Sequence, residues 1–149
     1  EQVSPLLVEE WCLVPDSGGA GRFRGGLTSC RTYRVNYDEA TFTVSGERGR
    51  SAPAGQFGGR AGSLFLCRVQ EAGGGERMVA AKGGVTVVKR GDRVSIQPAG
   101  SGGYGDPRER KRAAIEADLA DGYVTAEAVL RDYGLISKPR EAAMAEQPR

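Results

Sequence analysis

Five charged residues beside glycine clusters are the side chains of this sequence best suited to contact an anion or another protein chain. They are Asp16, Arg22, Arg24, Arg60 and Asp106. Arginine presents a planar fork of N–H donors that fits carboxylate and phosphate groups, and neighbouring glycines allow close backbone approach. For each of the five, an ion pair that fixes a loop is the stronger interpretation, and Asp106 is well placed to cap a helix. None of them is predicted to be catalytic.

The residue types that are missing limit the function more than any motif does. The chain has no histidine, which removes the commonest general base near neutral pH and the commonest metal ligand. A hydrolytic triad of the usual type is therefore excluded within it. The three cysteines, Cys12, Cys30 and Cys67, form no CxxC pair. We expect reduced, packed thiols, with a disulfide or a shared metal site as the alternative.

Glycine is the outlier of the composition, with 23 among 149 residues. Residues 100–105 match the GxGxxG pattern, but hairpins precede them and two helices follow, so a dinucleotide fold is not expected. The arginine-glycine stretches at 22–26 and 57–60 are too short, and the net charge of +2 too small, to favour RNA binding. Two interpretations stay open: ordinary turns, and extended polyproline II-like segments in which glycine lets backbones pack closely.

Apolar alternation indicates what must position these residues. Residues 1–105 are predicted to form an antiparallel β unit with Gly-rich segments. Its extended stretches lie at 3–14, 27–37, 40–45, 64–69, 78–81, 85–89 and 92–97, and glycines 73–75 form a hairpin tip. No apolar run approaches the roughly 20 residues of a membrane span, and the N-terminus lacks the features of a secretory signal. We expect a cytoplasmic protein that binds neither membrane nor nucleic acid.

Residues 106–137 are predicted to form two short helices, followed by a tail at 138–149. The first helix runs from a cap at Asp106 to about Ala120, with Glu109 where a capping-box acid belongs. The second is capped by Thr125 and stops at Gly134. The apolar stripe of these helices is thin, so its members should pack on the sheet or on a partner: Ile115, Leu119, Leu130 and Tyr133.

Four ordered motifs give the sequence a resemblance to a known family. They are PDSGGAGRFRGGL (15–27), GERGRSAPAGQFGGRAG (46–62), VVKRGDRVSIQPAGSGGYGDP (87–107) and DLADGYVTAEAVLRDYGL (118–135). In this order they resemble the C-terminal portion of the hydantoinase B/oxoprolinase family. Within that family, a free chain of this size is similar to the small β subunit of acetophenone carboxylase.

The resemblance implies two antiparallel β-sheets in a barrel-like arrangement that run into polyproline-type segments. It also implies a hetero-oligomer with large hydantoinase A-like and hydantoinase B-like subunits. ATP and a divalent metal, Mg or Mn, would be bound on those partners, with no cofactor on this chain. The leading expectation is a structural, active-site-shaping subunit of a biotin-independent carboxylase that converts acetophenone and bicarbonate to benzoylacetate. A subunit of an ATP-dependent hydantoin, oxoproline or lactam hydrolase and a stand-alone binding module are the alternatives.

Overall fold

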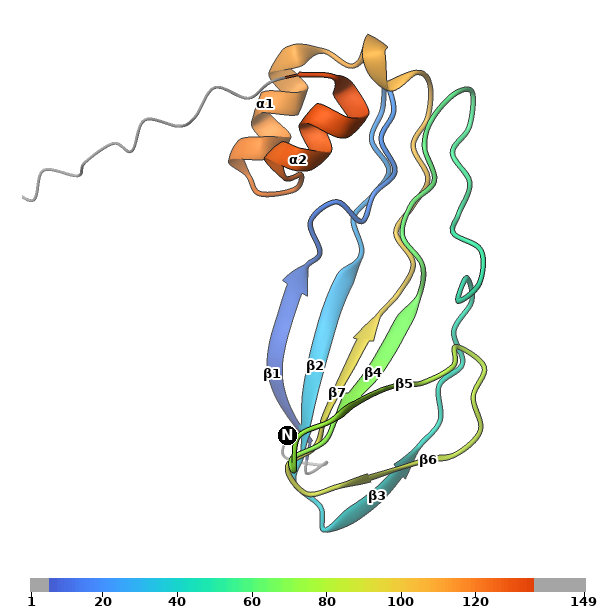
Figure 1. Cartoon of the computed structure of the whole chain (residues 1–149), viewed down its shortest axis with the longest axis vertical. Helices are drawn as coiled ribbons and strands as arrows, with labels where there is room; N and C mark the ends of the chain where they lie inside the picture. The colour runs from blue at the N-terminus through green and yellow to red at the C-terminus, as the bar shows by residue number, and fades with distance from the viewer. Residues whose placement is uncertain (1–5, 136–149) are drawn as a thin grey trace, which may run out of the picture.

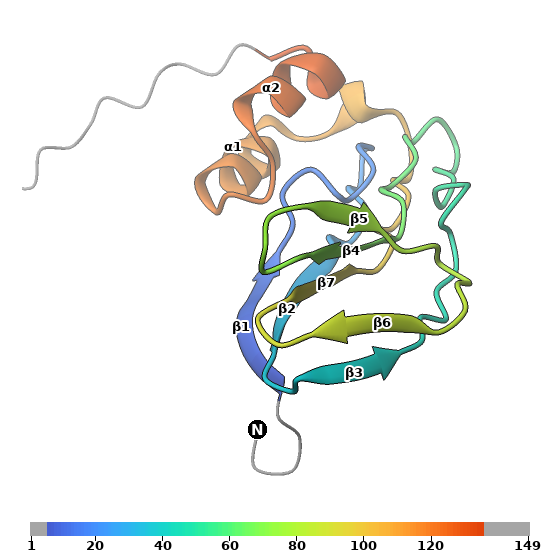
Figure 2. The ribbon, with the colours of Figure 1, turned by 60° about the horizontal axis from the view of Figure 1, so that its bottom comes forward.

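Five antiparallel strands form the larger sheet of the computed structural model, which describes residues 6–135. The strands, in their order across the sheet, are β1 (Leu6–Leu13), β2 (Ser29–Val35), β7 (Arg93–Gln97), β4 (Leu66–Gln70) and β5 (Glu76–Met78). A smaller sheet pairs β3 (Glu39–Phe42) with β6 (Thr86–Lys89). It lies at the lower end of the larger sheet (Figures 1 and 2). The prediction of a mainly β fold with two antiparallel sheets is confirmed.

One apolar core joins the two sheets. Residues Val35, Cys67 and Val69 are fully buried in it, and Val88 of β6 faces them from the smaller sheet. In β4 the buried Cys67 and Val69 alternate with exposed Arg68, as expected for a strand with one face inward. Within residues 6–135 the sheets do not close into a barrel, because β3 and β6 pair only with each other. The barrel-like arrangement is therefore not found.

Three glycine-rich segments continue from the upper end of the sheets and lie side by side (Figure 1). They cover residues 16–26, 53–63 and 99–105, and their backbones are hydrogen-bonded to one another. The Gly19 amide donates to the Ser101 carbonyl (2.8 Å), and the Gln56 amide donates to the Gly103 carbonyl (2.9 Å). We call this array the glycine bundle. It connects the sheets to the helices.

Most glycines in the bundle have no room for a side chain. A Cβ on Gly100 would lie 1.9 Å from the carbonyl oxygen of Ser17, and one on Gly103 would lie 2.2 Å from that of Ala20. Close backbone packing therefore explains these clusters, whereas the open Gly74, with a φ of +84°, belongs to a turn. The polyproline II-like conformation of the segments stays a prediction.

Two short helices cover the far end of the glycine bundle. After a 3-10 turn at Pro107–Glu109, α1 spans Arg112–Ala120, and α2 spans Ala126–Ala128 and continues into a π-helical turn at Val129–Tyr133. Their apolar residues pack on Ala20 of the bundle rather than on a sheet: Ile115, Leu119, Val124, Val129 and Tyr133. No helix within residues 6–135 is long and apolar enough to cross a membrane.

Several details differ from the sequence expectations. The helix expected from Asp106 is interrupted, because extended backbone at Arg110 and Lys111 separates the 3-10 turn from α1. Leu130 does not pack inward but is more than half exposed. Cys67 is a packed thiol, as expected, while Cys12 is exposed because it lies on the edge strand β1. The expected tail at 138–149 lies outside the described residues.

Candidate contact site at the far end of the glycine bundle

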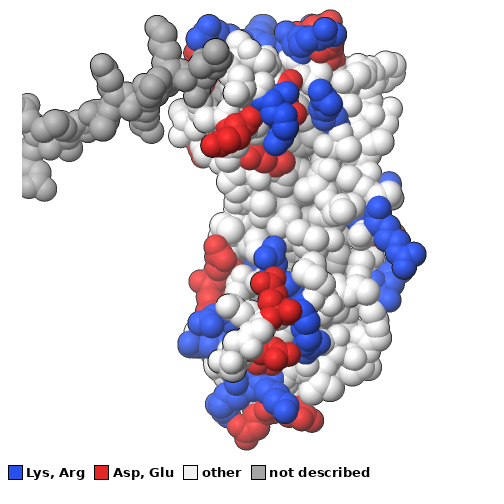
Figure 3. All heavy atoms as spheres, in the orientation of Figure 1, with Lys and Arg blue, Asp and Glu red and all other residues white. Residues whose placement is uncertain are grey.

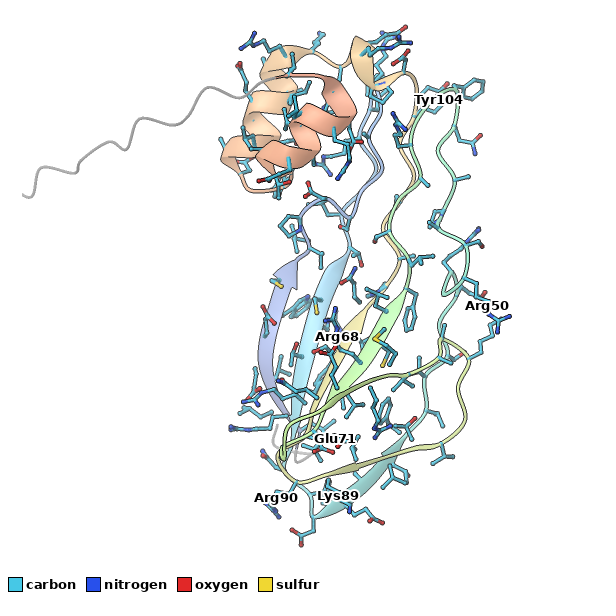
Figure 4. All side chains as sticks on the ribbon, in the orientation of Figure 1. Arg50, Arg68, Glu71, Lys89, Arg90 and Tyr104 are labelled. Carbon is cyan, nitrogen blue, oxygen red and sulfur yellow. The ribbon has the colours of Figure 1, made fainter. Side chains whose placement is uncertain are left out.

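Three exposed aromatic side chains meet where the glycine bundle is farthest from the sheets, and we call Phe23, Phe57 and Tyr104 the tip cluster. The Tyr104 ring centroid lies 6.3 Å from that of Phe23 and 5.0 Å from that of Phe57. Figure 4 shows Tyr104 at this end of the molecule. The three side chains are 60%, 79% and 50% exposed, respectively. Aromatic groups gathered in this way on a surface are typical of contact sites between proteins.

The glycine bundle itself positions the tip cluster. Tyr104 pairs with Phe23 through two backbone hydrogen bonds of 2.9 Å, and it forms a bridge to Gln56 on its other side. Phe57 then follows with a φ of +50°, in the left-handed region that a bulky residue rarely adopts. Such backbone strain costs on the order of 1–3 kcal/mol and concentrates at functional positions. Phe57 in the tip cluster is thus both strained and exposed.

Three of the five candidate residues lie around the tip cluster. The Arg22 guanidinium sits 5.6 Å from the centre of the Phe23 ring and 3.7 Å from the Glu109 carboxylate. Arg60 and Asp106 line a surface cleft of about 650 Å³ together with the π-helical turn. Arg60 makes no ion pair with any residue from 6 to 135, but its charge helps to lower the pKa of the nearby Asp106 carboxyl. Contact with an anion or another chain stays a prediction for these residues.

Asp106 caps the 3-10 turn, as the sequence predicts. Its Oδ1 accepts the backbone N–H of Arg108 at 2.9 Å, and its two oxygens accept the Arg108 Nε at 3.0 Å. The side-chain hydrogen bonds from Arg108, helped by the Arg108 amide, lower the pKa of Asp106 to about 2. Asp106 is therefore an anion at neutral pH and cannot act there as a general acid.

We expect the Asp106 carboxyl to titrate near pH 2 and the Arg108→Ala variant to return its pKa toward the ordinary value of about 4. Because folding lowers this pKa, the contact stabilises the fold above the unfolded-state pKa and is lost as the pH falls through about 2. Carboxyl 13C shifts measured against pH test this. Arg112→Ala, which removes an exposed arginine of α1, is the control. An unchanged Asp106 pKa in Arg108→Ala would refute the assignment.

The other two candidate residues contact the helices from within the chain. Asp16 accepts the Thr125 amide (2.8 Å) and the Thr125 hydroxyl (2.7 Å), and the same hydroxyl accepts the Ala128 amide and caps α2. Arg24 donates to both oxygens of Asp118 at 3.0 and 3.2 Å. These observed contacts fix the helices on the glycine bundle, so the structure does not bring Asp16 and Arg24 together with the tip cluster.

A buried charge cluster, which sequence reasoning missed, anchors α1. Arg110 donates to Asp118 at 2.7 Å beside Arg24, and the side chains of all three residues are at most 15% exposed. The extended backbone at Arg110 lets its side chain turn inward and reach Asp118. Sequence spacing gave no signal for this cluster, because 94 residues separate Arg24 from Asp118. An aromatic residue does lie inside each of the three glycine clusters of the bundle, and this is the signal that could have pointed to the tip cluster.

No group of three or more His, Cys, Asp or Glu side chains within residues 6–135 is arranged to hold a metal ion. The cleft beside Arg60 is lined by arginines and aspartates that largely pair with each other, such as Arg131 with Asp132 at 2.6 Å. The described part of the chain presents an exposed aromatic cluster and an internal charge cluster.

The sequence of this chain is similar to those of known proteins. It is 30% identical over 136 residues to caprolactamase subunit beta of Pseudomonas jessenii, and 33% identical over 134 residues to an uncharacterized protein of Methanocaldococcus jannaschii. In each case the match covers 89% of this chain and 23% of the relative. The chain thus spans about a quarter of the length of these relatives.

Solved structures reproduce the fold. The ATP-dependent caprolactamase of Pseudomonas jessenii matches with a TM-score of 0.78 and 29% identity, over 91% of this chain and 24% of that one. A nucleotide-free acetone carboxylase matches with a TM-score of 0.76 and 21% identity, over 90% of this chain and 22% of that one. The model of the hydantoinase B/oxoprolinase family matches residues 1–107. The chain belongs to the hydantoinase B/oxoprolinase family.

Proposed function

We propose that this chain is a non-catalytic module of a hydantoinase B-like subunit in an ATP-dependent enzyme complex. The observation that carries the proposal is the match to caprolactamase subunit beta over 89% of this chain. The exposed and strained tip cluster supports a role in assembly, because it presents aromatic surface that a single domain has no reason to expose. The lack of histidine in the whole sequence agrees with a supporting role.

In this proposal the partner subunits carry the energy-consuming chemistry. A hydantoinase A-like subunit binds ATP with a divalent metal, Mg or Mn, and activates the substrate by phosphorylation. A large hydantoinase B-like subunit builds the second active site. The tip cluster and Arg60 contact another chain of the complex, in which Arg60 meets an acidic group.

A cyclic amide is the substrate class that the relatives favour. One relative at 30% identity is a caprolactamase subunit, and one solved structure at 29% identity is an ATP-dependent caprolactamase. ATP-driven hydrolysis of a lactam or hydantoin ring is therefore our leading reaction. Carboxylation of a ketone such as acetophenone is the second candidate, because the ordered motifs at residues 15–27, 46–62, 87–107 and 118–135 resemble the family as a whole and do not distinguish the two reactions.

A purified complex separates the two reactions. The tagged chain, its hydantoinase A-like subunit and its large hydantoinase B-like subunit are produced together and supplied with ATP and Mg or Mn. We expect ATP hydrolysis that depends on a cyclic amide and yields the ring-opened amino acid. Turnover of acetophenone with bicarbonate, and not of the cyclic amide, would instead establish the carboxylase. If neither the cyclic amide nor the ketone stimulated ATP hydrolysis, both candidates would be contradicted.

Replacing Phe57 by Gly tests the role of the tip cluster. We expect the isolated chain to keep its stability or gain up to about 1 kcal/mol, because glycine relieves the left-handed strain at this position. Binding to the complex should weaken by about tenfold or more, since an aromatic contact is lost. Urea denaturation and a binding titration measure the two effects. Val85→Ala, at an exposed apolar residue outside the tip cluster, is the control, and equal binding by both variants would disprove the role.

A further inference from the structure

The edge strand β1 carries a row of exposed apolar side chains on one face of the larger sheet. Leu6, Val8, Trp11 and Leu13 pair in register with Val35, Tyr33, Arg31 and Ser29 of β2, respectively. Alternate residues of a strand share a face, so all four lie on the face that holds Val35 and the core. They are nevertheless 36%, 44%, 68% and 51% exposed. We call these four residues the β1 row.

A β-bulge is what keeps the β1 row on one face. Leu6 and Val8 have even numbers, whereas Trp11 and Leu13 have odd numbers, so a regular strand would point the two pairs in opposite directions. The pairing register shifts between Val8 and Glu10, and this extra residue restores the apolar side chains to the same face. The bulge thus aligns four apolar side chains that residues 6–135 leave partly exposed.

The smaller sheet leaves this part of the face open. It packs against Val69, Cys67 and Val94, while β1 forms one edge of the larger sheet (Figure 2). An apolar groove of about 420 Å³ between the sheets is continuous with the β1 row, because Leu6 and Tyr33 line it. The face therefore offers both a row of apolar side chains and a groove that can receive others.

The polar groups near the β1 row indicate a mostly apolar occupant. The Arg31 guanidinium lies 4.1 Å from the centre of the Trp11 ring, a stacking contact. The opposite face of β1 and β2 is charged, with Glu9 bridging Arg34 at 3.3 Å and Arg93 at 2.6 Å. An occupant with an apolar surface and one acidic group opposite Arg31 would complement the face that carries the β1 row. The charged, opposite face of β1 and β2 suits contact with water.

We propose that the β1 row is the surface that receives the remainder of the hydantoinase B-like polypeptide. This inference rests on the proposed function. The same fold occurs inside a caprolactamase chain of which it makes up 24%, so about three quarters of that polypeptide lies outside this module. The β1 row is an apolar layer that lacks its cover, and a polypeptide of that size supplies one. In this arrangement Trp11 is buried at the centre of the contact.

The test measures binding of the full chain to the remaining part of its hydantoinase B-like polypeptide. Leu13→Asp and Val8→Asp place a carboxylate in the β1 row, and each should raise the Kd by about tenfold or more. Met78→Asp is the matched control. Met78 is 61% exposed, but it pairs with Arg68 on the opposite face of the same sheet, so its Kd should not change. Urea denaturation verifies that each variant folds like the wild type.

The outcomes separate this inference from the proposed function. A loss of affinity in Leu13→Asp and Val8→Asp, with Met78→Asp unchanged, supports the β1 row as the docking surface. Tight binding by all three variants overturns the inference and leaves the proposed function standing. A wild-type chain that does not bind this polypeptide, but pairs with a second copy through the β1 row, overturns both. The fluorescence of Trp11, the sole tryptophan, reports self-association directly through a blue shift.

Discussion

Replacing Asp118 by Asn is expected to lower the free energy of unfolding by about 3–5 kcal/mol, because it leaves two buried guanidinium groups without a counter-charge. Asp118 accepts hydrogen bonds from Arg24 and Arg110, and all three side chains are largely withdrawn from water. The amide of Asn keeps the size of the side chain but accepts through a single oxygen. Urea denaturation followed by circular dichroism measures the change.

A matched control lies on the same helix. Glu116 pairs with Arg112 at 2.8 Å on the exposed side of α1, and Glu116→Gln should change stability by no more than about 0.5 kcal/mol. We expect Asp118→Asn to destabilise the helices before the sheets, since this carboxylate ties α1 to the glycine bundle. If both variants lost less than about 1 kcal/mol, the buried cluster would not be an anchor.

Replacing Gly100 by Ala is expected to destabilise the chain by about 3 kcal/mol, at the upper end of what a single excess methyl group costs. The new Cβ would lie 1.9 Å from the Ser17 carbonyl oxygen, which belongs to the backbone of a neighbouring segment and cannot simply rotate away. The segments 16–26 and 99–105 must therefore move apart. The backbone hydrogen bonds between them should weaken as a result. Hydrogen exchange at Gly19 and Ser101 should speed up accordingly.

Gly84→Ala is the control for this substitution, because a Cβ there meets nothing within 4 Å. Alanine restricts the unfolded chain more than glycine does, so stability should stay the same or rise by up to about 1 kcal/mol. If Gly100→Ala were as stable as Gly84→Ala, close packing would not explain the glycines of the bundle.

Much of the fold could be predicted from the sequence. Alternation of apolar residues located six of the seven strands within residues 6–135, since a strand with one buried face repeats every two residues. The stretch expected at 78–81 was misplaced, because β5 spans Glu76–Met78 and shares only Met78 with it. The helix ends were also predictable, because capping depends on local chemistry. They include the caps Asp106 and Thr125 and the stop at Gly134. Sheet closure depends on long-range pairing, which alternation does not encode, and the expected barrel is accordingly absent from residues 6–135.

The contact site could be predicted only in part. The glycine clusters left two interpretations open, turns and close backbone packing, and the sequence did not indicate that Phe23, Phe57 and Tyr104 meet. Asp118 and Arg110 could not be assigned, because their partner Arg24 lies far away in the sequence. The β1 row was hidden by the bulge at Val8, since a one-residue irregularity reverses the apparent parity of every residue after it.

Charged side chains are unevenly distributed over one face of the molecule (Figure 3). Figure 3 shows basic and acidic side chains gathered toward the two ends of this face, with a largely uncharged band between them over the glycine bundle.

Co-purification tests the central claim most directly. The tagged chain is produced together with its hydantoinase A-like subunit and the remaining hydantoinase B-like polypeptide, and the product is analysed by size-exclusion chromatography with light scattering. We predict that all three polypeptides elute as one complex that hydrolyses ATP, while the chain purified alone hydrolyses none. A chain that elutes by itself, as a stable monomer with neither large partner, would contradict its assignment as a module of this assembly.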